Sequence, residues 1–515
     1  MAIFAFEPVG FEGELVTVEV DLRRGIPCVD LVGLPDGAVK EARERIRAAI
    51  RNSGFEFPLQ RLLISLAPAG VRKGGASFDL AMAMAVLSAS GQIPDYGESI
   101  LALGELELSG RVRPVAGVLS AVAAGLRVGI PRFIVPRGNI MEARALAGDA
   151  AFAIDGLDDC IRLSVAARSA SMADEADPPG PEPGVDMNEG LDGLDMADIR
   201  GQPALRRAME VSAAGGHHLL LFGPPGVGKS MAARRLSGLL PDLDDDDSII
   251  VTTLYSLAGA LPERSGLIRK PPFRAPHHGA SAEGIVGGGR SRKPGEISLA
   301  HGGVLLLDEA AEFRADVLQS LREPLEEGRV TIARADRVVS YPSRFMLVLS
   351  CNPCPCGNLG RRGAVCLCSP DEIRRYWKRL GGPLLDRIDI RVPVKPAGPV
   401  ELASGPGEPS SSIRSRVRKA REIQADRFSD TACKVNGRLT VSGIERFCAL
   451  GDQARIAFVI KAEREGFSSR ACHSTLKVAR TIADLEGASN IEVRHLDEAF
   501  SLRKYGDDDV FWLIP

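Results

Sequence analysis

Apolar and polar residues alternate along residues 15–22, the pattern of a strand with one buried face. Residues 61–66 and 132–135 form short apolar stretches that also suit strands, whereas residues 39–50 repeat apolar positions at helical spacing. The pattern predicts that residues 1–166 fold as an α+β domain.

Residues 191–395 have a different hydrophobic pattern, in which short apolar runs alternate with helical segments. The runs at 219–222, 304–307 and 345–352 read as buried strands, and residues 231–240 read as a helix. Such alternation is typical of an α/β domain, in which crossover helices connect the strands of a parallel sheet.

Residues 396–515 are predicted to form a helical C-terminal lid domain, a small bundle with helical patterning throughout from about residue 412. The expected helices are 413–428, 453–466, 471–486 and 493–503. A linker is expected at 167–190, because residues 171–190 hold six acids, four prolines and no Lys or Arg. A weaker break lies at 396–412, which is rich in Pro, Gly and Ser.

Composition narrows the function classes. The 515 residues carry 64 Lys and Arg against 67 Asp and Glu. This balance excludes a protein that coats nucleic acid through an overall positive charge, but it does not exclude a local basic channel. Apolar runs fall short of the ~20 residues of a membrane helix. The first residues have no basic segment of the signal-peptide kind. A cytoplasmic protein with no membrane partner is expected.

The strongest motif follows the apolar run 219–222 and matches the P-loop pattern of two glycines, Lys and Ser. In such a loop, backbone N–H groups surround phosphate oxygens, the lysine reaches the β- and γ-phosphates, and the serine hydroxyl ligates Mg²⁺. The expected ATP-binding residues are Gly223, Pro224, Pro225, Gly226, Val227, Gly228, Lys229 and Ser230.

Two further strand ends carry polar groups suited to ATP hydrolysis. Asp308 and Glu309 follow the run 304–307, and Asn352 ends the next strand. Asp308 is expected to hold Mg²⁺, Glu309 to polarise the attacking water and Asn352 to orient that water. Arg387, which lies between two acids, is interpreted as an arginine finger that acts on a neighbouring subunit's ATP, with a structural salt bridge as the alternative.

Five of the ten cysteines fall between residues 351 and 368. Cys354 and Cys356 form one C-x-C pair, and Cys366 and Cys368 form a second pair, with nine residues between the two pairs. Four thiolates suit tetrahedral Zn²⁺, although the spacing differs from the usual C-x₂-C pairs and a loop of free thiols is the alternative. Cys351 is expected to be buried in the strand end.

Between the P-loop and Asp308, residues 283–293 combine three consecutive glycines with three cations. Arg290, Arg292 and Lys293 are candidates for contacts with a DNA backbone, and a solvated loop is the alternative. A second basic stretch, at 414–421, is more often one solvated face of a helix than a DNA contact.

Together these motifs resemble the magnesium-chelatase-like AAA+ proteins, and more narrowly the ComM/YifB family. The resemblance rests on GPPGVGKS, GEISLAHGGVLLLDE, SCNPCPCG and GPLLDRIDI, and on the PFRAPHH element at residues 272–278. It implies that Gln202, in a short helix before the core, helps to hold adenine. It also implies that Arg470 is the sensor-2 arginine of the helical lid.

The N-terminal domain resembles the α/β fold of Lon-type proteases and of a small-subunit ribosomal protein. Ser77 stands where that protease family has its nucleophile, but the position of its catalytic lysine reads Ala121. A serine without its base is a poor nucleophile. The domain is therefore predicted to be non-proteolytic, with Ser77 as a helix cap.

The resemblance implies a homo-hexameric ATPase that uses ATP and Mg²⁺ and promotes DNA branch migration during recombination and natural transformation. Two other functions stay open: a protein-remodelling ATPase of the chaperone class, and a magnesium chelatase subunit for tetrapyrroles. Stimulation of ATP turnover by branched DNA, by unfolded protein or by chelatase partners would separate the three.

Overall fold

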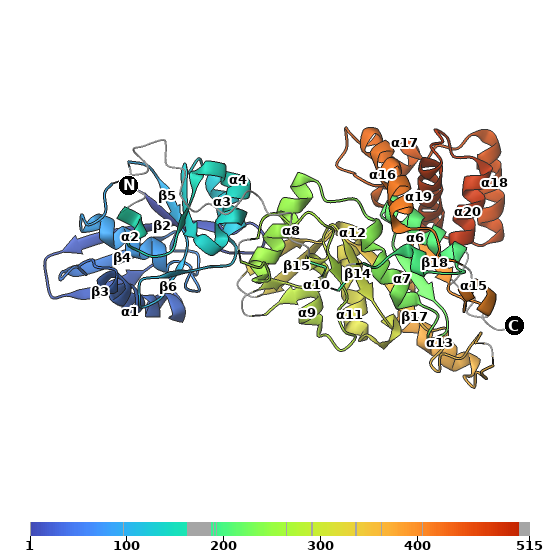
Figure 1. Cartoon of the computed structure of the whole chain (residues 1–515), viewed down its shortest axis with the longest axis horizontal. Helices are drawn as coiled ribbons and strands as arrows, with labels where there is room; N and C mark the ends of the chain where they lie inside the picture. Colours follow the sequence, from blue (N-terminus) through green and yellow to red (C-terminus); the bar gives the residue numbers. More distant parts are fainter. Residues whose placement is uncertain are drawn as a thin grey trace.

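The computed structural model describes residues 2–161 and 187–503, apart from residues 96, 189, 192, 264, 290, 291, 335, 336, 362 and 404. Three units follow one another along the chain (Figure 1): an N-terminal α+β unit, an α/β core, and a helical unit packed on one end of that core. Most of the expected linker at 167–190 lies outside the described residues, so its role as a boundary stays a prediction.

In the N-terminal unit, seven strands within the described residues form one mixed sheet in the order β3-β4-β2-β1-β5-β8-β9. Its strands are β1 (Ile3–Glu7), β2 (Glu14–Arg23), β3 (Cys28–Val32), β4 (Arg61–Ala67), β5 (Ile100–Ala102), β8 (Arg132–Pro136) and β9 (Ala151–Ile154). β6 (Glu105–Leu106) and β7 (Val112–Arg113) pair separately. The helices are α1 (Gly37–Asn52), α2 (Asp79–Ala89), α3 (Val118–Arg127) and α4 (Ile140–Ala147). The three expected strands and the expected helix of this unit are confirmed.

Helix α2 is apolar all round, and its residues from Asp79 to Leu87 are all buried. Asp79, at its start, is held by a bidentate contact from Arg45. The expected cap by Ser77 is wrong: the helix begins at Asp79, so Phe78 takes the capping position and no side chain caps the helix. Ala121 is buried in α3.

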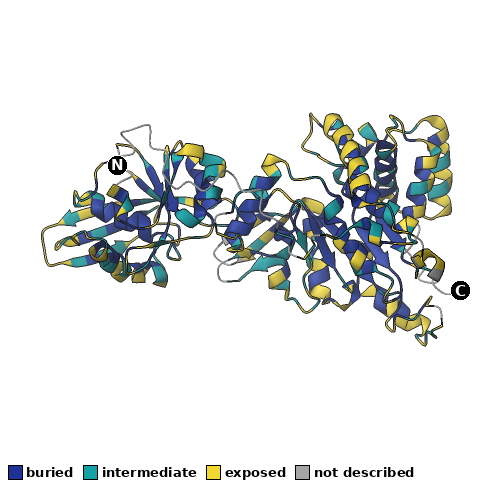
Figure 2. Ribbon diagram, in the orientation of Figure 1, coloured by how far each residue is buried: buried dark blue, intermediate teal, exposed yellow. Residues whose placement is uncertain are grey.

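In the core, five described strands form a parallel sheet in the order β11-β14-β17-β10-β18. They are β11 (Phe273–Arg274), β14 (Val304–Leu307), β17 (Met346–Cys351), β10 (Leu219–Phe222) and β18 (Ile390–Pro393). β10, β14 and β17 are buried along their whole length (Figure 2), which explains why they read as continuous apolar runs.

Helices and two hairpins surround this sheet. The helices are α6 (Pro203–Gly215), α7 (Lys229–Arg235), α8 (Asp245–Ala258), α9 (Ala282–Val286), α10 (Glu296–Leu299), α11 (Ala315–Ser320), α12 (Arg322–Glu327), α13 (Pro370–Lys378) and α14 (Gly382–Leu385). The hairpins pair β12 (Gly287–Gly288) with β13 (Lys293–Pro294), and β15 (Arg329–Arg334) with β16 (Arg337–Pro342). The helix expected at 231–240 is shorter than predicted: α7 ends at Arg235, and the chain turns through Ser237–Leu239 where Gly238 and Pro241 disfavour an α-helix.

The helical unit consists of α15 (Pro399–Ala403), α16 (Ser410–Arg427), α17 (Val441–Phe447), α18 (Asp452–Arg464), α19 (Ser469–Leu485) and α20 (Val493–Arg503). The four helices expected from periodicity are confirmed as α16, α18, α19 and α20. Among the described residues, no helix combines the length and the apolar character that crossing a bilayer requires.

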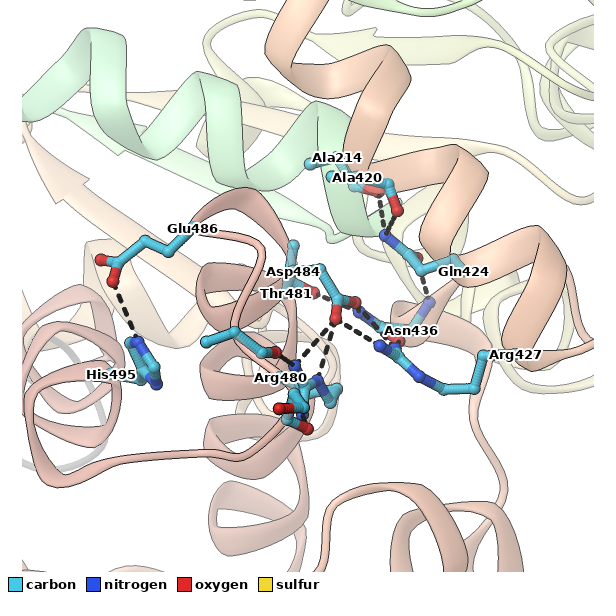
Figure 3. A network of polar contacts seen from close by, with 12 residues as sticks. Ala214, Ala420, Gln424, Arg427, Asn436, Arg480, Thr481, Asp484, Glu486 and His495 are labelled. Carbon is cyan, nitrogen blue, oxygen red and sulfur yellow. Dashed lines mark hydrogen bonds and ion pairs between the residues drawn. The ribbon is translucent and has the colours of Figure 1, made fainter.

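A buried polar network ties this helical unit together and joins it to the core (Figure 3). The buried carboxylate of Asp484 accepts hydrogen bonds from Arg427, from Arg480 at 3.0 Å and from Asn436 at 2.8 Å. Gln424 donates to the Ala214 carbonyl near the end of α6 at 3.0 Å. A buried carboxylate needs such partners, so the network fixes α16 and α19 against α6.

The N-terminal unit meets the core along α3 and α8 (Figure 1). The Gly117 N–H donates to the Ser256 hydroxyl at 3.0 Å. Glu142, in the neighbouring helix α4, is buried, and this burial raises its pKa to about 7 despite hydrogen bonds from Asn139 and Ser256. The two units are thus joined by specific polar contacts.

Candidate nucleotide-binding site

The ends of three neighbouring parallel strands meet at one edge of the core sheet, which we call the carboxyl edge. In β10 and β17, Phe222 pairs with Cys351, and in β14 and β17, Leu307 pairs with Leu349. The residues that follow these strands are Gly223, Asn352 and Asp308. The three sequence motifs therefore leave the sheet side by side, where open α/β sheets bind ligands.

Lys229 is 8% exposed and donates three hydrogen bonds: to the carbonyls of Gly223 at 2.7 Å and Pro224 at 2.9 Å, and to Oδ1 of Asn352 at 3.1 Å. All three acceptors are neutral. Burial lowers the pKa of Lys229, while the nearby charges of Asp308 and Glu309 act in the opposite direction. An ammonium group with only neutral contacts in a buried position favours an anionic ligand such as phosphate.

The P-loop glycines have the conformations that the motif requires. Gly226 and Gly228 have φ angles of +81° and +91°, which disfavour residues with a Cβ. A Cβ on Gly223 would lie 2.2 Å from the Val394 carbonyl oxygen, so the loop runs directly against the end of β18. Ser230, in the first turn of α7, is half-buried beside Lys229.

Gln202 precedes α6, and its Nε2 donates to the Val227 carbonyl in the P-loop at 3.1 Å. The structure thus brings this residue to the loop, with Pro203 at the first helical position. The role of Gln202 in holding adenine stays a prediction.

Asp308 and Glu309 follow β14. Glu309 has a φ angle of +52°, which is uncommon for a non-glycine residue, and its side chain is exposed. Asp308 is half-buried, and its Oδ1 accepts the Glu309 N–H at 3.2 Å. One strand end thus carries a half-buried carboxylate followed by an exposed one, at the positions where a metal ligand and a general base are expected.

Cys351 is fully buried beneath this edge, as predicted, and burial raises the pKa of its thiol to about 12. The thiol therefore stays protonated at neutral pH and packs with the apolar residues of the core.

Arg387 lies at the opposite, amino edge of the sheet. It stands three residues before β18, whose first residue, Ile390, pairs with Leu219 at the start of β10. The P-loop begins only after β10 ends, and a four-residue strand spans about 13 Å. Among the described contacts, none joins Arg387 to the P-loop of its own chain.

Arg470, in the first turn of α19, lies beside Arg387. Both guanidinium groups bind Oε1 of Glu326, near the end of α12. The structure therefore brings the two predicted arginines together, away from the other site residues. Sequence reasoning missed Glu326, because it sits in an acidic helix that reads as a solvated surface.

The four paired cysteines converge. The Sγ atoms of Cys354, Cys356, Cys366 and Cys368 all lie within 4.8 Å of one another, and three of the S···S distances are 3.4, 3.6 and 3.7 Å. Tetrahedral Zn²⁺ with Zn–S bonds of ~2.3 Å separates its sulfur ligands by about 3.8 Å.

The thiols of this cluster differ in their pKa values. The Asn358 backbone N–H lowers the pKa of Cys356 to about 7, whereas burial raises the pKa of Cys354 to about 12. A cation that replaces the protons would let all four sulfurs act as thiolates. The donor set fits zinc.

The expected DNA-contacting loop is only partly described, since Arg290 lies outside the described residues. The Arg292 carbonyl accepts a hydrogen bond from Tyr341 at 2.6 Å, and the exposed Lys293 donates to the Ala258 carbonyl at 2.9 Å. The β12–β13 hairpin is thus docked on β16 and on the last residue of α8.

The second basic stretch, in α16, serves mainly to attach that helix. Arg414 and Arg421 donate to core carbonyls, and Arg416 pairs with Glu210 and Glu408. The stretch is therefore not simply the solvated helix face that its sequence suggested.

A further set of buried residues that sequence reasoning missed joins the sheet to the lid. His217, just before β10, contacts Asp389 at 3.0 Å and Thr481 in α19 at 2.8 Å. Ser474 in α19 also donates to Asp389. Burial lowers the pKa of His217. The tandem His217-His218 ahead of the P-loop strand was the available sequence signal.

A parallel sheet with a P-loop after β10, a polar residue and a carboxylate pair at the ends of the next two strands, and a helical lid defines a P-loop ATPase of the AAA+ class. Three family profiles match the chain: "Magnesium chelatase, subunit ChlI" over residues 195–402, "Subunit ChlI of Mg-chelatase" over residues 18–139, and "Magnesium chelatase, subunit ChlI C-terminal" over residues 407–503.

Two curated relatives are similar over nearly the whole chain. Competence protein ComM of Haemophilus influenzae is 40% identical over 504 residues, which cover 97% of each protein. Protein YifB of Escherichia coli is 39% identical over 498 residues, which cover 96% of this chain and 95% of YifB. The chain belongs to the ComM/YifB family of magnesium-chelatase-like AAA+ ATPases.

A partial similarity supports the interpretation of the N-terminal unit. Lon protease of Geobacter metallireducens is 31% identical over 142 residues, which cover 26% of this chain and 17% of that protein. The N-terminal unit is thus Lon-like.

Proposed function

We propose that this protein is a hexameric AAA+ ATPase that couples ATP hydrolysis to movement on DNA, as a branch-migration helicase in recombination and natural transformation. The observation that carries the proposal is the 40% identity, over 97% of both chains, to a protein named for competence. Competence involves the handling of incoming DNA, so DNA is the polymer we assign. The ten free cysteines suit the reducing cytoplasm, where we place the protein.

The division of the proposed site between two edges of the sheet supports a ring. Lys229 and Glu309 lie at the carboxyl edge, whereas Arg387 and Arg470 share Glu326 at the amino edge. When subunits pack head to tail, the amino edge of one faces the carboxyl edge of the next, and such an interface repeats into a ring. In this arrangement the arginines stabilise the transition-state charge on the neighbour's γ-phosphate.

Within one subunit, each residue at the carboxyl edge has a separate role. Lys229 binds the β- and γ-phosphates, and the loop N–H groups surround them. Ser230 and Asp308 would hold Mg²⁺, which neutralises phosphate charge when bound. Glu309 takes a proton from the attacking water, and Asn352, already bonded to Lys229 at 3.1 Å, orients that water.

The assay that tests the proposal compares ATP turnover in the presence of branched DNA, duplex DNA and an unfolded protein. We expect branched DNA to give the largest stimulation. Stimulation by unfolded protein alone would establish the protein-remodelling function instead, and stimulation only by chelatase partner subunits would establish the tetrapyrrole function.

The loop that carries Arg290, Arg292 and Lys293 is the proposed DNA contact. We expect the combined change Arg290→Ala, Arg292→Ala and Lys293→Gln to keep basal ATP turnover, to abolish DNA stimulation and to make DNA affinity less dependent on salt. Gln at position 293 retains an N–H donor for the Ala258 carbonyl, which Lys293 now binds.

The matched control is the double change Arg418→Ala and Lys419→Ala, which removes two exposed cations from α16. Arg418 pairs only at the surface with Glu422, at 3.3 Å, so stability should change little. Wild-type DNA affinity and wild-type salt dependence in the triple variant would reject this loop as the DNA contact.

We also propose that Cys354, Cys356, Cys366 and Cys368 bind one structural Zn²⁺. The sulfur separations of 3.4–3.7 Å support it. Metal analysis of protein purified without chelators should give about one zinc per chain, falling well below that in the Cys366→Ser, Cys368→Ser variant. Natively purified protein that contains no zinc but is active in the ATP-turnover assay would contradict the proposal.

A further inference from the structure

The cysteine cluster follows directly on the residue that contacts Lys229. Asn352 accepts from Lys229 at 3.1 Å, and Cys354 is only two residues further along the chain. Between them, the Pro353 carbonyl accepts from the indole N–H of Trp377 in α13 at 3.2 Å. The segment that carries Asn352 is therefore held from both sides, by α13 and by the first cysteine.

The cysteine loop also touches the P-loop itself. Gly357, one residue after Cys356, has a φ angle of +74°, and its N–H donates to the Cys354 carbonyl at 3.0 Å. A Cβ on Gly357 would lie 3.0 Å from Cδ of Pro225 and 4.0 Å from Cγ of Asn352. The loop thus lies against two separate parts of the nucleotide site.

The far end of the loop is fixed as well. Cys368 directly precedes Ser369, which caps α13 in a reciprocal capping box with Glu372. α13 in turn carries Trp377, whose ring packs edge-on against Phe222, the last residue of the P-loop strand, with centroids 6.0 Å apart. Cys354 is buried in the same apolar cluster.

We propose that the zinc-bound cysteine loop is a brace that positions Pro225 of the P-loop and Asn352 for nucleotide binding, so that metal occupancy of the loop controls affinity for nucleotide. This inference rests on the ATP site and the zinc site proposed above. Loss of the metal removes the zinc–sulfur bonds that close the cysteine loop. Gly357 is then no longer held in contact with Pro225.

Two glycines of the loop offer a matched comparison. Gly357 and Gly363 have nearly the same φ angle, +74° and +75°, so the backbone strain that Ala introduces is alike at both. Only Gly357 has a neighbour where the new Cβ would stand, whereas a Cβ on Gly363 meets no described atom within 4 Å. Any difference between the variants therefore reports the contact with Pro225.

The experiment measures zinc content and MgADP affinity of the full-length protein. ADP binding requires neither hydrolysis nor a neighbour's arginine. We expect Gly357→Ala to keep zinc but to weaken MgADP binding by about tenfold, because the Cβ displaces the P-loop. Gly363→Ala should keep both zinc and affinity. Equal affinities in the two variants would overturn the brace.

A second measurement covers metal loss. The chain has two tryptophans, so in a Trp512→Phe background the fluorescence of Trp377 reports its own surroundings. Chelation of zinc, or the change Cys366→Ser with Cys368→Ser, should shift this fluorescence and weaken MgADP binding together. Unchanged MgADP affinity in zinc-free protein that retains its helical circular dichroism would overturn the inference.

The outcomes also separate this inference from the proposed function. Wild-type protein that binds zinc and MgADP but never hydrolyses ATP would refute the proposed function and leave the brace intact. Wild-type protein that hydrolyses ATP and binds MgADP equally tightly with and without zinc would refute the brace and leave the ATPase intact.

Discussion

The change Arg387→Ala should lower ATP turnover by about 10³-fold or more and leave ATP affinity nearly unchanged. The reason is positional: Arg387 precedes β18 at the amino edge of the sheet, whereas the P-loop leaves the carboxyl edge. The arginine therefore cannot contribute to ATP binding in its own subunit, but can stabilise charge on a neighbour's γ-phosphate. Turnover measured at saturating ATP checks the expected loss of hydrolysis, and a separate binding measurement checks the unchanged ATP affinity.

Mixing the Arg387→Ala protein with Lys229→Ala protein should recover part of the activity. The first variant supplies an intact P-loop and the second an intact Arg387, so some mixed interfaces are complete. The control is Arg374→Ala, which removes an exposed arginine of α13 that pairs with Asp371 in the same helix at 3.4 Å and should leave turnover unchanged. Absence of recovery at every mixing ratio would count against action between subunits.

The change Glu309→Gln should reduce ATP turnover by about 10²- to 10⁴-fold while ATP still binds. An amide cannot take a proton from water, but it has the size of the carboxylate, so the left-handed turn at φ +52° keeps its shape. Asp308, the proposed Mg²⁺ ligand, is untouched by this change. Single-turnover hydrolysis at saturating ATP measures the effect.

Glu312→Gln is the matched control for this experiment, since Glu312 is an exposed acid three residues further along, 3.8 Å from Arg379. We expect its turnover to equal that of the wild type. Rapid hydrolysis by the Glu309→Gln variant, or slow hydrolysis by the Glu312→Gln variant, would mean that a different carboxylate activates the water.

The features that sequence predicts well here are local ones. The P-loop, the Asp308-Glu309 pair and Asn352 each follow a fully buried strand, and a run of apolar residues bounded by polar ones marks such a strand in the sequence itself. A parallel sheet then brings the three strand ends together. The converging cysteines were likewise foreseeable, because two C-x-C pairs flank one short loop.

The features that sequence does not predict depend on contacts between distant residues. Glu326 binds Arg387 and Arg470, which lie 61 and 144 positions further along the chain, and no pattern near Glu326 marks it. The arginines of α16 look like a solvated face until the helix is seen against α6. Ser77 has the residue type of a cap, but the helix start is set by burial of α2, two residues later.

Because Lys229 and Arg387 lie at opposite edges of one sheet, a chain changed at both residues should inactivate assemblies that it forms with normal chains more strongly than a chain changed at one. In the proposed ring, a chain altered at Lys229 inactivates its own site and a chain altered at Arg387 inactivates its neighbour's site, so each single change removes one site per altered chain. A chain with both changes removes two. In a cell that makes normal and doubly altered chains in equal amounts, about a quarter of the sites in randomly mixed rings remain complete, against about half for either single change. The double variant should therefore be the more strongly dominant allele.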